Sequence, residues 1–138
     1  MNIEFINDKE WGIDKEAFSP IIKRLKGAVD CLEGVLNVVF VNDTYIQALN
    51  KSYRKKDTPT DVLSFNYRTD DVNSKLIGEI YISVDTAKRQ AKEYKHTLQD
   101  ELAKLFVHGF LHIHGYDHET EEGYKIMSGL ESNVLRVK

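Results

Sequence analysis

Hydrophobic residues recur along this chain with two spacings, one typical of strands and the other of helices. Four short segments alternate apolar and polar residues or are rich in β-branched residues, and they predict strands at 3–7, 35–41, 62–67 and 76–83. Five longer segments carry apolar residues three or four positions apart, and they predict helices at 14–33, 45–53, 85–95, 97–114 and 119–135. The alternation of the two kinds of element favours a layered domain of sheet and helix.

The order of these elements predicts an α+β fold with a small mixed sheet. The strands at 62–67 and 76–83 are joined by a short polar turn at 68–75, so we expect them to pair antiparallel, whereas helices separate the other strands. The chain has only two prolines, no Gly/Ser-rich linker and no internal repeat. We therefore expect one domain over residues 1–138, in which four strands pack against about five helices.

The composition is that of a soluble protein with one core. Of 138 residues, 41% are hydrophobic and 30% are charged. The net charge is −3, so a phosphate-bearing partner must be held by a local site. No apolar run approaches the ~18 residues of a membrane span. The N-terminus does not have the pattern of a signal peptide. Cys31 is the only cysteine and therefore cannot form an internal disulfide. We expect a cytoplasmic protein without a membrane partner.

All five histidines lie within residues 96–118, and three of them have the spacing of a metal site. His108 and His112 are four positions apart on a predicted helix, about 40° apart around its axis, so both imidazoles can reach one ion. Gly115 can adopt a positive φ and reverse the chain, which brings His118 to the same point. Three imidazoles with an open fourth position are typical of catalytic zinc. We predict one zinc ion per chain, which nickel or copper could replace during purification.

The surroundings of the helical pair favour a metal ion over two independent histidines. Residues 105–113 are apolar apart from His108, His112 and Gly109, so this helix is predicted to be buried. Buried imidazoles need partners, and one metal ion serves both, whereas the alternative is a separate hydrogen bond for each. His114 lies roughly 140° around the helix from the pair and is expected to point elsewhere.

The spacing H-x-x-x-H-x-x-G-x-x-H is that of the metzincin metalloproteases, with one difference. Their general base is a glutamate directly after the first histidine, whereas this chain has Gly109 at that position. The metal scaffold is therefore predicted to be present, but a peptidase of that type would lack its base.

A basic segment before the third predicted strand could hold a phosphate. Four of the six residues 51–56 are cationic, in a chain that is acidic overall. Arg54 could bind a phosphate through two hydrogen bonds and Lys56 could add a point charge, while Asp57 and Asp61 could orient the arginine or cap the turn. The alternative is a helix C-terminus complemented by cations, which requires no function.

Together the two segments resemble the YbeY family of bacterial metal-dependent endoribonucleases. The family motif H-G-x-L-H-x-x-G-Y-D-H is complete between His108 and His118. Further matches to the family are Asn50, Tyr53-Arg54, Lys56-Asp57, Pro59-Thr60-Asp61-Val62-Leu63-Ser64-Phe65 and Gly78-Glu79-Ile80. The resemblance spans most of the chain from about residue 35 to 131.

The resemblance implies a single zincin-like metallo-endoribonuclease domain. It implies a zinc-dependent, single-strand-specific endoribonuclease of the cytoplasm that matures the 3′ end of 16S rRNA and acts in ribosome quality control. Its expected partners are single-stranded RNA, rRNA and the ribosome. The expected site comprises the metal ligands His108, His112 and His118, the catalytic and phosphate-binding Arg54, the substrate-binding Lys56, and the supporting Gly115 and Asp117.

Three other functions remain open at this point. A metallopeptidase would use the same ligands without the usual glutamate. A metal-dependent hydrolase of small phosphates or amides would act without RNA, and a ribosome-binding module would use zinc only for structure. For RNA cleavage the missing glutamate is tolerable, because either water at the metal or the RNA's own 2′-hydroxyl can attack, and the sequence leaves both open.

Overall fold

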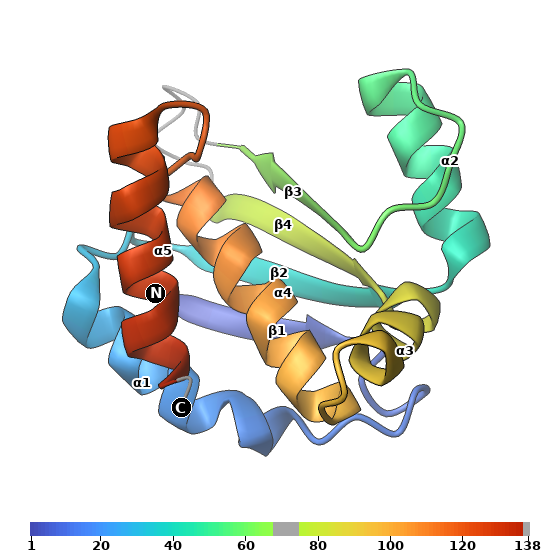
Figure 1. Ribbon diagram of the computed structural model, residues 1–138, viewed down its shortest axis with the longest axis horizontal. Coiled ribbons are helices and arrows are strands. Elements are labelled where there is room, and N and C mark those ends of the chain that lie inside the picture. The colour runs from blue at the N-terminus through green and yellow to red at the C-terminus, as the bar shows by residue number, and fades with distance from the viewer. Residues whose placement is uncertain (68–74, 137–138) are drawn as a thin grey trace.

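A mixed sheet of four strands lies at the centre of the computed structural model, which describes residues 1–67 and 75–136 (Figure 1). The strands are β1 (Asn2–Ile6), β2 (Val35–Val41), β3 (Val62–Asn66) and β4 (Leu76–Ser83). In the order β1-β2-β4-β3, the first three run parallel, and β3 pairs antiparallel with β4 at the edge of the sheet. The predicted mixed sheet is confirmed, and the predicted turn at 68–75 lies outside the described residues except for its last residue.

Five α-helices and a short 3-10 helix accompany the strands in the described part of the chain. They are η1 (Lys15–Phe18), α1 (Ser19–Ala28), α2 (Asp43–Arg54), α3 (Val84–Glu93), α4 (Leu98–Ile113) and α5 (Glu121–Leu135). Four α-helices begin at a polar side chain that accepts a backbone N–H of the first turn, namely Asn42, Ser83, Thr97 and Thr120. Among these described helices, none combines the length and the apolar character needed to cross a membrane.

The helix predicted at 14–33 is shorter in the structure and is divided in two. Pro20 stands in the first turn of α1, where its missing N–H removes no helical hydrogen bond, and η1 precedes it. Helix α1 ends at Ala28 because Val29 has an extended backbone, with φ −129° and ψ 139°. The end of the helix is therefore set by Val29, well before Gly34.

Helices cover both faces of the sheet. Alternate residues of β2 point to opposite sides, so Leu36 and Phe40 join the large core that α1, α4 and α5 complete, while Val39 and Val41 pack with Ile46 of α2. In Figure 1, α4 crosses the sheet with α5 and α1 on its left, and α2 stands at the right beside β3.

Two glycines let α4 lie directly on the sheet. A Cβ atom added to Gly109 would stand 2.8 Å from Ile80 Cγ2, and one added to Gly78 would stand 2.9 Å from Ile113 Cδ1. Both distances are shorter than the normal contact distance between carbon atoms, which is about 3.5–4.0 Å. The helix that carries the histidine pair is thereby held against β4, next to the edge strand β3.

Candidate metal centre and active site

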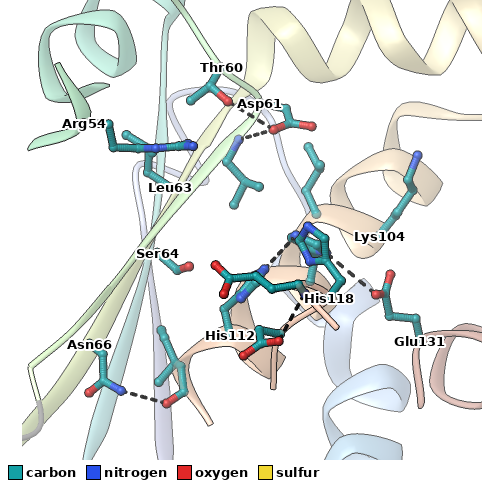
Figure 2. Close-up of a pocket in the computed structure, with 16 residues that line it drawn as sticks. Arg54, Thr60, Asp61, Leu63, Ser64, Asn66, Lys104, His112, His118 and Glu131 are labelled. Carbon is teal, nitrogen blue, oxygen red and sulfur yellow. Dashed lines mark hydrogen bonds and ion pairs between the residues drawn. The ribbon is translucent and has the colours of Figure 1, made fainter. Parts of the chain in front are cut away.

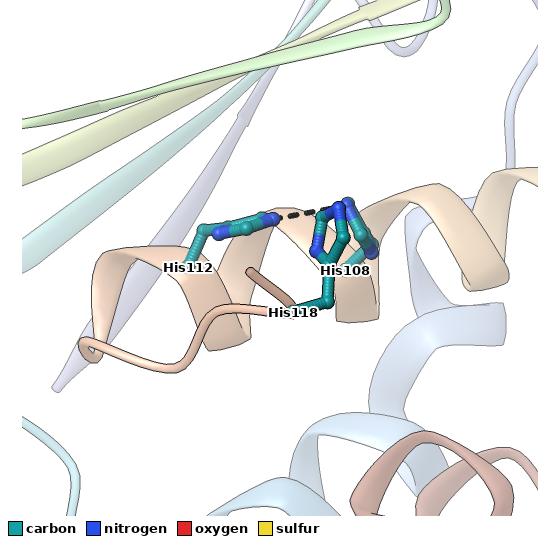
Figure 3. A group of neighbouring side chains, drawn as sticks. All are labelled: His108, His112 and His118. Carbon is teal, nitrogen blue, oxygen red and sulfur yellow. Dashed lines mark hydrogen bonds between the residues drawn. The ribbon is translucent and has the colours of Figure 1, made fainter. Parts of the chain in front are cut away.

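The C-terminal half of α4 presents two imidazoles to the same point. His108 and His112 lie one turn apart, with 3.0 Å between their Nε2 atoms and 4.5 Å between their ring centroids (Figure 3). Both side chains are half-buried. Two imidazole nitrogens at this distance need a proton or a cation between them, because their lone pairs would otherwise repel.

The turn after α4 brings a third imidazole to the pair. Gly115 has φ +92°, and its N–H donates to the carbonyl oxygen of His112 at 3.0 Å, which ends the helix and reverses the chain. The ring centroid of His118 then lies 5.6 Å from that of His108 and 5.4 Å from that of His112. The positive φ predicted for Gly115 is confirmed, and the three histidines lie together.

These three side chains fit a divalent metal ion. One nitrogen atom from each lies within 4.8 Å of the others, and tetrahedral zinc with bonds of about 2.0–2.1 Å places its ligand atoms about 3.3 Å apart, so small side-chain movements close the site. Burial, followed by the charges of His108 and His118, lowers the pKa of His112. The lowered pKa favours the neutral imidazole, which is the form that binds a metal.

The two helical histidines have partners behind them that leave their Nε2 atoms for the metal. Glu131 of α5 places Oε1 3.7 Å from Nδ1 of His108, and the backbone of Tyr116 acts on His112 so as to oppose the fall in its pKa. A carboxylate or carbonyl behind a metal-binding histidine fixes the ring and raises its basicity. Sequence reasoning missed Glu131, although its place on the same face of α5 as the buried Met127 and Val134 was a signal.

The histidines lie in a pocket of about 720 Å³ between α4 and the edge strand β3 (Figure 2). Most of its lining residues are polar, and they come from α2, β3, α4, α5 and the loops between them. The lining residues are Arg54, Thr60, Asp61, Val62, Leu63, Ser64, Asn66, Lys104, Leu105, His108, His112, Ile113, Asp117, His118, Glu119 and Glu131. On the β3 side, Asn66 Nδ2 donates to the carbonyl oxygen of Ile113 at 3.1 Å, which ties the strand to the end of α4.

Arg54 reaches this pocket from the last position of α2. Its side chain is exposed, and among the described residues it has no hydrogen bond or ion pair. In Figure 2 it lies at the opposite side of the pocket from Glu131, with Ser64 between it and the histidines. The guanidinium therefore has all its donors available for an anion in the pocket.

The other predicted site residues divide between the pocket and its surroundings. Asp117 lines the pocket, and its Oδ1 accepts the N–H of Glu119 at 3.2 Å. Lys56 is exposed and lies outside the lining residues. Asp57 accepts a hydrogen bond from Gln47 at 3.1 Å and therefore serves the turn rather than the arginine.

A buried acid, Glu101, connects the wall of the pocket to the helices behind the pocket. The sequence alone did not predict this connection. Glu101 is fully buried in α4, with its two carboxylate oxygens 2.7 Å from His96 Nε2 and 2.7 Å from Gln90 Nε2. Gln90 also donates to Asp61 at 3.4 Å, and Asp61 caps Val62 N–H at 2.8 Å. The start of β3 is thus linked to α3 and α4.

His114 stays outside the centre, as predicted. Its ring stacks on Phe110 with centroids 4.3 Å apart, and its Nε2 accepts the N–H of Leu32 at 3.2 Å. Both contacts lie on the side of α4 away from the metal ligands, so this histidine joins the loop after α1 to the helix.

Comparison with known proteins identifies relatives over nearly the whole chain. A family model described as Endoribonuclease YbeY matches residues 4–137. A protein of Oceanobacillus iheyensis called Endoribonuclease YbeY is 41% identical over 149 aligned positions, which cover 98% of this chain and 96% of the relative. A protein of the same name from Heliobacterium modesticaldum is 40% identical, with 96% of this chain and 93% of the relative covered.

The fold is also that of a solved structure. The solution structure of TM1509 from Thermotoga maritima matches with a TM-score of 0.60 and 28% identity, and the match covers 96% of this chain and 88% of that one. The family match spans both the histidine motif and the segment that carries Arg54. The chain therefore belongs to the endoribonuclease YbeY family, whose name describes a hydrolase that acts on the phosphodiester bonds of RNA.

Proposed function

We propose that this protein is a zinc-dependent endoribonuclease that cleaves single-stranded RNA in the pocket between α4 and β3. The observation that carries the proposal is that Arg54, which has no ion pair with any described residue, lines the same pocket as three imidazoles that each have a nitrogen atom within 4.8 Å of the others. A cationic metal and a free guanidinium on opposite sides of one cavity suit a phosphodiester anion.

The chain's own residues would each have a defined task in this reaction. His108, His112 and His118 would hold zinc through neutral imidazoles and so leave its full charge for the phosphate. When bound, zinc supplies a Lewis acid that polarises a phosphoryl oxygen and lowers the pKa of water. Arg54 would donate two hydrogen bonds to phosphoryl oxygens and stabilise the negative charge that develops in the transition state.

The position of Gly109 argues against the metallopeptidase alternative. The glutamate of a metzincin would stand here, and a Cβ at this position would already meet Ile80 of β4 at 2.8 Å. The position faces the sheet, so a glutamate side chain would have no room beside the metal. RNA cleavage does not require a glutamate at this position, because either water at the metal or the 2′-hydroxyl of the RNA can attack.

The proposed biological setting rests on the resemblance to the family. We propose that the RNA cleaved is rRNA, at the 3′ end of the 16S molecule, and that the enzyme acts on the ribosome in the cytoplasm in a quality-control role. The family model and the relatives' names support an RNA substrate. Cleavage of precursor 16S rRNA within isolated ribosomal particles, compared with free RNA of the same sequence, tests this part of the proposal.

The central test is an assay of zinc-reconstituted protein on labelled single-stranded RNA and on the same RNA in a duplex. We expect Arg54→Ala to lower the rate roughly 10²–10³-fold, which is the effect of removing one electrostatic stabiliser, with unchanged zinc content. Arg54→Lys should restore part of the rate, because it keeps the charge but not the paired donors. Lys92→Ala, which removes an exposed cation from the last turn of α3, should have no effect.

Three outcomes would contradict the proposal. A His112→Ala protein that cleaves as fast as the parent would show that the activity comes from a contaminant. Turnover of small phosphate esters without RNA cleavage would assign a small-molecule hydrolase, and ribosome binding without any turnover would assign a binding module. A substrate with one 2′-deoxynucleotide at the scissile position identifies the nucleophile, because it blocks attack by the 2′-hydroxyl alone.

A further inference from the structure

Five aromatic rings form a continuous cluster on the face of the sheet opposite the metal centre. They belong to Tyr45 and Tyr53 of α2, Phe65 of β3, Tyr81 of β4, and Tyr67 just after β3, and we call them the aromatic shelf. Phe65 is at its centre, with centroids 5.0 Å from Tyr53, 6.4 Å from Tyr67 and 5.7 Å from Tyr81. Tyr45 stacks on Tyr81 at 6.1 Å.

Three rings of the shelf are much more exposed than side chains that pack in the core. Tyr53 is 68% exposed, Tyr45 is 51% exposed and Tyr67 is 37% exposed, whereas Leu63 and Val39 beneath the cluster are buried. Grouped, exposed rings of this kind mark an interaction surface rather than a core.

One strand separates the shelf from the pocket. Side chains alternate along β3, so Ser64 and Asn66 line the pocket while Phe65, between them, belongs to the shelf. Arg54 lines the pocket and is the direct neighbour of Tyr53 in α2. Because β3 is the edge strand, an extended chain that crosses this edge can contact the pocket and the shelf at the same time.

Charge around the shelf favours a polyanion. Lys51, Lys55 and Lys56 are all exposed beside Tyr53 and Arg54. Of the described acids here, Asp57 lies 3.9 Å from Lys51, and Glu79 accepts hydrogen bonds from the hydroxyls of Tyr67 at 3.0 Å and Tyr81 at 3.3 Å. The carboxylate of Glu79 therefore holds the rings of Tyr67 and Tyr81 in place through these hydrogen bonds.

Two tyrosines of the shelf, Tyr67 and Tyr81, are held in the neutral form. Burial and then the hydrogen bond to Glu79 raise the pKa of Tyr67 to about 12, and burial followed by the charge of Glu79 raises the pKa of Tyr81. A ring that carries no phenolate charge does not repel the phosphates of a nucleic acid, so its face remains available for stacking.

We propose that the aromatic shelf binds the bases of single-stranded RNA by stacking, for the strand whose phosphodiester lies in the pocket. This inference rests on the proposed function. Stacking on aromatic side chains tolerates any base sequence, but it needs bases that are free of a partner strand. The shelf therefore provides a physical reason for single-strand specificity.

The test compares Tyr53→Ala with Tyr53→Phe on two substrates, a single-stranded oligonucleotide of about ten residues and a dinucleotide that fills only the pocket. We expect Tyr53→Ala to raise KM, and the Kd for an uncleavable oligonucleotide, roughly 5–100-fold, which corresponds to the loss of one stacked base. The kcat and the dinucleotide rate should not change. Tyr53→Phe should behave as the parent, because it keeps the ring.

Further controls separate stacking from general damage. Tyr124→Ala removes a ring of α5 that is 59% exposed and lies outside the shelf and the pocket, and it should have no effect. Replacing the flanking nucleotides by abasic ones should weaken binding by the parent and abolish the difference between parent and Tyr53→Ala.

The outcomes for the shelf and for the nuclease are distinct. If the parent binds the oligonucleotide but does not cleave it, the proposed function fails while the Kd of each variant still tests the shelf. If the parent cleaves and both Tyr53→Ala and Tyr67→Ala bind RNA as tightly as the parent, the shelf proposal is overturned. Unchanged RNA binding together with weakened ribosome binding would assign the shelf to a protein partner, which also overturns it.

Discussion

Glu131 is positioned to tune the metal centre without touching the metal. Its carboxylate lies 3.7 Å from His108 Nδ1, and carboxylates in this position orient a histidine ligand and raise its basicity. We expect Glu131→Gln to weaken zinc affinity about 10–100-fold, as measured by competition with a chromophoric chelator. The matched control is Glu121→Gln, which changes an exposed acid of the same helix. Equal zinc affinity in both variants would exclude this role for Glu131.

Gly115 and Gly129 allow a paired test of backbone conformation. A Cβ on either residue would meet no atom within 4 Å, but Gly115 has φ +92° whereas Gly129 lies inside α5. Gly115→Ala should therefore cost about 1–2 kcal/mol of stability and weaken zinc binding, because the turn that carries His118 shifts. Gly129→Ala should raise stability by about 0.5–1 kcal/mol. Thermal unfolding and chelator competition measure both, and a gain in stability at Gly115 would mean that the turn has a different geometry.

The contact between α4 and β4 determines where the histidine pair stands. Gly109→Ala would place a Cβ 2.8 Å from Ile80 Cγ2, and overpacking of this kind costs about 1–3 kcal/mol. We expect lower stability and weaker zinc binding, because α4 must move away from the sheet. A double-mutant cycle with Ile80→Ala checks the cause, since the second change makes room for the new Cβ and the two effects should then be less than additive.

Much of this arrangement was accessible from local sequence. The strands and most of the helices followed from the spacing of apolar residues or from runs of β-branched residues, because these patterns are local. The grouping of the three histidines followed from spacing, because His108 and His112 share a helix and Gly115 ends it. The prediction of one continuous helix at 14–33 was wrong, because apolar periodicity does not show that the backbone becomes extended at Val29.

The parts that were missed depend on contacts between distant segments. Glu131 meets His108 only because α5 packs against α4. The link from Glu101 through Gln90 to Asp61 joins three elements, and nothing in the sequence around any one of them indicates the other two. The aromatic shelf has the same origin, since the alternation in β3 is readable but the position of α2 above it is not.

The protein as a whole should lose zinc and stability together on acidification. The pKa of His112 is lowered, chiefly by burial, so the folded state holds fewer protons than the unfolded chain below about pH 6.5. The free energy of unfolding of zinc-free protein should therefore fall as the pH drops below about 6.5, and zinc occupancy should fall with it because protons compete for the ligands. Thermal unfolding and elemental analysis across this range measure the two effects. His112→Gln should flatten the stability profile, and occupancy that increases toward low pH would contradict the assignment.

The three proposed metal ligands differ in how they are held, and we expect this difference to govern the exchange of the ion. Two stand on one helix packed against the sheet, whereas His118 is exposed in the loop between α4 and α5. We expect the ion to leave by first losing His118 and to rebind at the helical pair, without the unfolding of any strand or helix. Metal replacement is then a local event of one loop, so the residence time of the ion is separate from the lifetime of the fold.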